Sequence, residues 1–190
     1  MEINNIEDMK NYLQEFVKAV YIKYNGITKE VAFTGMIVKK TVDILTSAEF
    51  VYKKNIITVQ ISLLRLLCDN CLAIESAIEL GIPMVMNIIE NNQRVNDVLI
   101  DEENYMTDGY LKRKVAEQYP GFDKLYRFAS ESVHFSSQAI TSAFITDNDG
   151  KQKLSVKEGN PELKEELKSN QDSMITLSKI IIDMLKKVLK

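Results

Sequence analysis

With 190 residues, of which 45% are hydrophobic and 27% charged, the chain has the composition of an ordinary soluble globular protein. Its net charge of -3 and pI near 5.4 argue against coating of nucleic acid through bulk charge, although a local basic site could still bind RNA. Only three prolines and seven glycines interrupt the helical periods, which favours an all-α fold. We expect a single helical domain over residues 1–190.

Two amphipathic helices are predicted at the start of the chain. The first covers Ile6–Tyr24, begins after Asn4 and Asn5, which make a plausible N-terminus, and is closed by Gly26. The second begins after Thr28, which can cap it, and continues to about Tyr52. Its lysines point outward, so we expect it to pack on one side.

The next segment, residues 56–80, is predicted to be the central helix. It carries apolar residues on nearly every side, and a helix that is apolar all round must be surrounded by other elements. Gly81 and Pro83 supply the expected stop. We therefore predict a bundle of about six or seven helices around this helix, with Leu66, Leu67 and Ile74 buried.

The central helix also carries a polar stripe, formed by Ser62, Arg65, Asp69 and Ser76. Arg65 and Asp69 lie one turn apart in what should be a largely dry environment, where charges are costly unless they are paired. Loss of Asp69 would then cost on the order of 3–5 kcal/mol. The pair is predicted to serve fold specificity or a site.

Cys68 and Cys71 form a C-x-x-C spacing in the middle of the same helix. A redox pair would need an exposed helix N-terminus and a zinc site would need two further ligands, so we interpret both cysteines as small core residues. One histidine and no paired inward carboxylates leave too few ligands for a metal, and no cofactor is expected. No leader sequence and no unbroken apolar span are visible, so we expect a cytoplasmic protein without a membrane partner.

The second half of the chain is predicted to hold shorter helices. One runs over 84–99 and is followed by an acidic loop at 101–104; a second is capped by Thr107 or Asp108 and ends near Tyr119, before Pro120. A third helix is expected from Phe122 to about 144. The polar segment at about 146–160 is interpreted as a surface loop or short hairpin, and the last helix as 161–189.

Arg127 and His134 are the residues with the clearest catalytic potential. Seven residues of helix place them about 20° apart in direction and about 10 Å apart along the axis, so they would share a face. The guanidinium could stabilise a phosphodiester while the imidazole moves a proton. The structural alternative is an ordinary ion pair between Arg127 and Glu131 beside a core histidine. Spacing alone favours that alternative.

The segment from Arg127 to His134 resembles the Rx4-6H motif of the HEPN superfamily of all-α domains, at the upper limit of the spacing. Many HEPN members are metal-independent ribonucleases, toxins of toxin–antitoxin pairs or phage-defence effectors that act as homodimers. The resemblance implies that Arg127 stabilises the scissile phosphate and that His134 is the acid or base. Phe128 departs from the pattern, since nuclease members usually have a polar residue there, and other HEPN domains bind nucleotides or partners without cleaving.

A further resemblance, over roughly residues 62–140, is to a group of uncharacterised bacterial proteins. It rests on an R-x-x-x-D helix (Arg65, Asp69), a T-D-x-Y-L segment that begins at Thr107, and an S-x-x-[IV]-H-x-S helix that begins at Ser130. The sequence therefore leads to two hypotheses. The first is a homodimeric ribonuclease in which Arg65, Asp69, Ser130 and Glu131 support the catalytic pair. The second is a non-catalytic module that binds a cognate regulatory protein or a small anionic ligand.

Overall fold

The computed structural model describes residues 3–100, 105–131, 143–146, 149–154 and 159–190. The predicted all-α fold is confirmed, since these residues form seven α-helices, two 3-10 turns and one small hairpin. The α-helices are α1 (Ile6–Tyr24), α2 (Lys29–Lys53), α3 (Ile57–Leu80), α4 (Ile82–Glu90), α5 (Asp108–Gln118), α6 (Phe122–Glu131) and α8 (Lys164–Val188). The 3-10 turns are η1 (Val95–Asp97) and η2 (Pro161–Leu163), and the antiparallel hairpin pairs β1 (Phe144–Thr146) with β2 (Gln152–Leu154).

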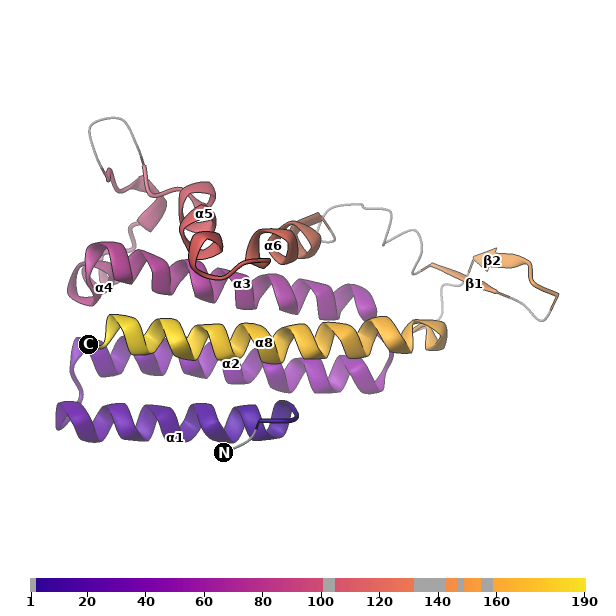
Figure 1. The fold of residues 1–190 in the computed structure, drawn as a ribbon, viewed down its shortest axis with the longest axis horizontal. Coiled ribbons are helices and arrows are strands. Elements are labelled where there is room, and N and C mark those ends of the chain that lie inside the picture. Colours follow the sequence, from indigo (N-terminus) through magenta and orange to yellow (C-terminus); the bar gives the residue numbers. More distant parts are fainter. Residues whose placement is uncertain (1–2, 101–104, 132–142, 147–148, 155–158) are drawn as a thin grey trace.

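Four long helices, α1, α2, α3 and α8, lie side by side along the long axis of the molecule (Figure 1). The helices α5 and α6 pack on α3, and α4 packs at one end of α2 and α3. The hairpin projects beyond the opposite end of the bundle (Figure 1). α3 therefore contacts α2, α4, α5, α6 and α8, which confirms its central position.

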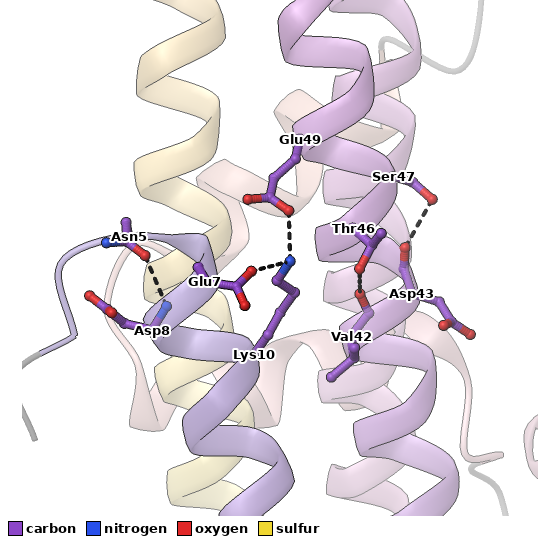
Figure 2. Close-up of polar contacts among 9 residues, drawn as sticks. All are labelled: Asn5, Glu7, Asp8, Lys10, Val42, Asp43, Thr46, Ser47 and Glu49. Atoms are coloured by element: carbon purple, nitrogen blue, oxygen red, sulfur yellow. Dashed lines mark hydrogen bonds and ion pairs between the residues drawn. The ribbon is translucent and has the colours of Figure 1, made fainter.

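The first two helices begin at side-chain caps, as predicted. The Asn5 side chain accepts a hydrogen bond from the Asp8 backbone N–H at 2.9 Å, and Thr28 Oγ1 accepts one from the Val31 N–H at 3.4 Å. Lys10 of α1 is joined to α2 by Glu49, which lies 2.7 Å from its Nζ (Figure 2). Its Nζ also lies 2.6 Å from Glu7, one turn earlier on α1. The hydrogen bonds to Glu49 and Glu7 raise the pKa of Lys10.

α3 is mostly but not completely enclosed. Leu67 and Ile74 are fully buried as predicted, whereas Leu66 is 40% exposed and Val59 44%. These two exposed residues are seven apart and share one face of the helix, which the neighbouring helices leave open. The prediction that Leu66 is buried was therefore wrong. By length and hydropathy alone α3 could cross a membrane, but half of that span is buried inside the fold, as in a core helix.

Buried polar contacts join α3 to its neighbours. Gln60 Nε2 donates to the Leu167 carbonyl at 3.0 Å, and Gln60 Oε1 accepts from Asn170 Nδ2 at 3.2 Å, which links α3 to α8. On the other side, Asn70 Nδ2 donates to Thr41 Oγ1 of α2 at 3.0 Å. Because buried polar groups are costly when unpaired, these contacts favour one alignment of the three helices.

The two cysteines are core residues, as expected. Cys68 and Cys71 are fully buried free thiols. Burial raises the pKa of the Cys68 thiol to about 12 and raises that of Cys71 well above its ordinary value. Neither side chain is a reactive thiolate at neutral pH.

Three predicted helix boundaries differ from the structure. The helix expected over 84–99 begins earlier, with Pro83 inside its first turn, and ends at Glu90, because Asn92 takes a left-handed conformation with φ of 54°. The helix expected from Phe122 to about 144 is described up to Glu131, and its expected last residue, Phe144, lies in a strand. The last helix begins with a 3-10 turn, so that α8 proper starts at Lys164.

The segment before α8 is fixed to the turn between α2 and α3. The Asn160 N–H donates to the Asn55 carbonyl at 3.0 Å, and Asn160 Nδ2 donates to the Phe144 carbonyl at 3.0 Å. Gly159 has φ of 72°, and a Cβ at this position would lie 2.1 Å from the Lys54 carbonyl oxygen. Only glycine fits this close approach between two backbones.

Candidate functional site around Arg65

Arg65, in the middle of α3, is the centre of a polar cluster. Its Nε donates to Ser130 Oγ at 2.9 Å, its Nη2 donates to the Tyr126 hydroxyl, and its guanidinium forms an ion pair with Asp69. The guanidinium also lies over the Tyr126 ring, 4.1 Å from the ring centroid. One side chain of α3 therefore holds α6 through three separate interactions.

This arrangement follows from helix geometry. Arg65 and Asp69 are one turn apart on α3, and Tyr126 and Ser130 are one turn apart on α6. Packing of α6 on α3 brings these two faces together. Arg65 and Asp69 form the ion pair that their spacing indicates, and Ser130 belongs to the same cluster.

The environment of this pair is wetter than expected. The Arg65 side chain is 18% exposed and that of Asp69 35%, so the prediction of a largely dry pair was wrong. The reason is that both residues lie at the edge of the contact between α3, α5 and α6 instead of in the centre of the core. The predicted loss of a fully buried pair on Asp69 removal is too large for this setting.

Asp108, at the start of α5, extends the cluster. Its Oδ2 lies 4.0 Å from Arg65 Nη2, and its Oδ1 accepts a hydrogen bond from Asn96 Nδ2 at 3.0 Å. The sequence suggests for Asp108 only the role of a helix cap, which Thr107 takes by accepting a hydrogen bond from the Tyr110 N–H. The signal that could have placed Asp108 is its position in the T-D-x-Y-L segment. Asp108 and Ser130, one residue from each of the other two segments that carry the second resemblance, thus lie near Arg65.

A pocket of about 350 Å³ lies beside the cluster, between α2, α3, α4 and α5. Arg65, Asp69, Asn96 and Asp108 line its polar part. Most of its remaining wall is hydrocarbon, from Phe33, Met36, Leu72, Val85, Ile89 and Leu111. An apolar concavity with a few convergent polar groups is the usual form of a small-molecule site.

Arg127 lies on a different face of α6. It follows Tyr126 directly, so it points about 100° away from the side chain that contacts Arg65. Its guanidinium pairs with Asp123, one turn earlier, at 2.8 Å, and its side chain is 67% exposed. The ion pair that the structure records for Arg127 is therefore with Asp123 and not with the expected partner Glu131, whose side chain is exposed.

The other sequence-predicted residues fall outside the cluster. His134 lies outside the described residues. Among the contacts that described residues make with Arg65, none comes from Glu131. The basic residues of α5 have partners, since Lys112 pairs with Asp123 at 2.9 Å and Lys114 with Glu79 at 3.6 Å. These two lysines of α5 therefore form ion pairs with α6 and α3.

A buried carboxylate, Glu75, was not predicted. It lies on α3 and is only 1% exposed, with Gln118 Nε2 donating to its two oxygens at 3.3 and 3.4 Å. Burial, followed by the nearby charge of Glu79, raises the pKa of the Glu75 carboxyl. No spacing in the sequence distinguishes Glu75 from an exposed helical glutamate.

Comparison of the chain with family models, with curated proteins and with solved structures finds no match. The resemblance to HEPN domains therefore stays a prediction.

Proposed function

We propose that the chain is a metal-independent ribonuclease that acts through α6, with Arg127 contacting the scissile phosphate and His134 acting as the acid or base. The observation that carries this proposal is the way in which α6 is held. Arg65 anchors the inner face of the helix through Tyr126 and Ser130, while the Arg127 guanidinium on another face remains largely exposed. A cation that is accessible on a firmly held helix can meet a phosphate with little loss of entropy.

The chemistry would need only these two side chains. A guanidinium offers paired N–H donors that suit a phosphate and can stabilise the charge that develops during cleavage. A histidine near its ordinary pKa can transfer a proton at neutral pH. An incoming phosphate would exchange for the Asp123 carboxylate on Arg127, and Asp123 would keep its ion pair with Lys112.

The test is cleavage of single-stranded RNA in the presence of chelator. Wild-type protein should cleave, and Arg127→Ala and His134→Ala should abolish cleavage with little change in melting temperature. Lys124→Ala is the matched control, because it removes an exposed cation from the same helix outside the motif. An inert wild type, or equal losses from the Arg127 and Lys124 variants, would refute the proposal.

The proposed ribonuclease acts as a homodimer, as the resemblance to HEPN domains implies. Sedimentation of the wild-type protein at the RNA-cleavage concentration measures this directly. A monomer that cleaves RNA would reject the dimer while leaving the roles of Arg127 and His134 standing.

The second candidate function is a non-catalytic module that binds a cognate regulatory protein. The observation that favours it is the ion pairing of Arg127 with Asp123, an interaction that structural helices commonly have. In that case wild-type protein would not cleave RNA, and His134→Ala would lower the melting temperature because the partners of a core histidine would lose hydrogen bonds. The same two assays thus separate the candidates.

A further inference from the structure

The pocket beside Arg65 has the dimensions and walls of a small-molecule site. Its volume of about 350 Å³ lies at the lower end of the range for ligand pockets, roughly 300–1,000 Å³. Phe33, Val85 and Leu111 are buried side chains from three different helices that form the inner wall. Such a wall is held by the core and does not depend on a surface loop.

The opening of the pocket exposes hydrocarbon to solvent. Met36 of α2 and Ile89 of α4 both line the pocket and are each 40% exposed. A ligand whose hydrocarbon part covered these two side chains would remove apolar surface from water, which is favourable in proportion to the area.

The polar part of the pocket carries more negative than positive charge. Asp69 and Asp108 contribute two carboxylates and Arg65 one guanidinium, so the formal charge of the three side chains is -1. The guanidinium is already engaged by Ser130, Tyr126 and Asp69. An anion would therefore compete with Asp69 for Arg65, whereas a cation would balance the remaining negative charge.

Asp108 is placed to receive such a cation. Asn96 holds its Oδ1 by a hydrogen bond at 3.0 Å, and its Oδ2 lies 4.0 Å from Arg65 Nη2, which is beyond hydrogen-bonding distance. The carboxylate is thus oriented by Asn96 and only weakly neutralised by Arg65.

We propose that this pocket binds a small organic amine, with its ammonium group on Asp108 and its hydrocarbon part against Met36, Ile89 and the inner wall. The site is separate from the proposed RNA function, because it uses neither Arg127 nor His134. It therefore holds whether or not the chain cleaves RNA.

The experiment compares three probes with the same six-carbon chain: hexylamine, 1-hexanol and hexanoate. Each is titrated into the wild-type protein at neutral pH, and binding is followed by changes in the backbone amide resonances of the protein. Hexylamine, which is an ammonium ion at this pH, should bind at least tenfold more tightly than hexanoate, with 1-hexanol between them. Equal affinity for the three probes, tighter binding of hexanoate or no binding of hexylamine would overturn the proposal.

Two variants locate the site. Asp108→Asn should reduce the preference for hexylamine over 1-hexanol at least threefold, because it removes the weakly neutralised carboxylate. Ala73→Phe should abolish binding of hexylamine, because Ala73 lines the pocket and a ring would fill it. The control Asp183→Asn removes a carboxylate on α8 that pairs with Lys187 at 3.0 Å, and should leave affinity unchanged. Binding of hexylamine that survives in Ala73→Phe would place it elsewhere and overturn the assignment.

Discussion

Replacement of Arg65 by Met tests whether this side chain ties α6 to the core. The substitution keeps a long apolar side chain but removes the hydrogen bonds to Tyr126 and Ser130, the ion pair with Asp69 and the contact over the Tyr126 ring. Hydrogen bonds from a charged donor contribute about 1.5–3 kcal/mol each, and a cation–π contact about 0.5–1 kcal/mol.

These contributions do not simply add in the partly exposed setting of Arg65. Its side chain is 18% exposed and that of Asp69 35%, so water can replace part of what is lost. We therefore expect a loss of about 2–3 kcal/mol in the free energy of unfolding. Asp69→Ala should cost less, about 1–2 kcal/mol, because Arg65 keeps Tyr126 and Ser130.

Chemical denaturation of both variants gives the two free energies, and amide hydrogen exchange reports on α6 separately. Exchange should accelerate in α6 more than in α1, which does not contact Arg65. The control is Lys39→Met, which removes an exposed cation paired with Asp43 on α2 and should change stability by less than about 0.5 kcal/mol. If Arg65→Met costs no more than this control, the described role of Arg65 is wrong.

Two further predictions concern Glu75 and Gly159. Burial raises the pKa of Glu75 in the folded protein above its value in the unfolded chain, so the free energy of unfolding falls as pH rises from the unfolded-state pKa through the folded-state pKa. Glu75→Gln should therefore be more stable than wild type at pH 8, and urea unfolding should show this difference shrinking towards pH 4. A stability difference between Glu75→Gln and wild type that does not change with pH would contradict the raised pKa of Glu75. Gly159→Ala should lower the free energy of unfolding by more than about 2 kcal/mol, because φ is positive there and the new Cβ would collide with the Lys54 carbonyl oxygen. Gly150→Ala should lower it less, because Gly150 has a similar φ but a Cβ there would meet no other atom. Equal losses in thermal unfolding would show that the close approach to Lys54 is unimportant.

The long helices could be predicted from the sequence because their signals are local. Asn5 and Thr28 are caps whose partners lie three residues away, and apolar periodicity over 19 and 25 residues identified α1 and α2. The exposure of Leu66 could not be predicted, because an apolar residue on a central helix is buried only if a neighbouring helix covers that face. The end of α4 was missed because the left-handed conformation of Asn92 is one that asparagine tolerates but does not require.

The candidate site was predicted only where its contacts are local. Arg65 and Asp69 are one turn apart, so their pairing follows from helical spacing. The contacts of Arg65 with Ser130 and Asp108 depend on how α5 and α6 cross α3, and spacing along the chain does not give that crossing. The same limit explains why Glu75 was missed, since its burial results from helices that follow it in sequence.

The buried contacts of Gln60 with Leu167 and Asn170 also bear on the order in which the protein folds. They join residues that are 107 and 110 positions apart. During synthesis the apolar side of α3 therefore emerges from the ribosome long before α8 can cover it, and contacts at such separation form slowly. The nascent chain should therefore leave the apolar surface of α3 that α8 covers exposed until α8 has been synthesised.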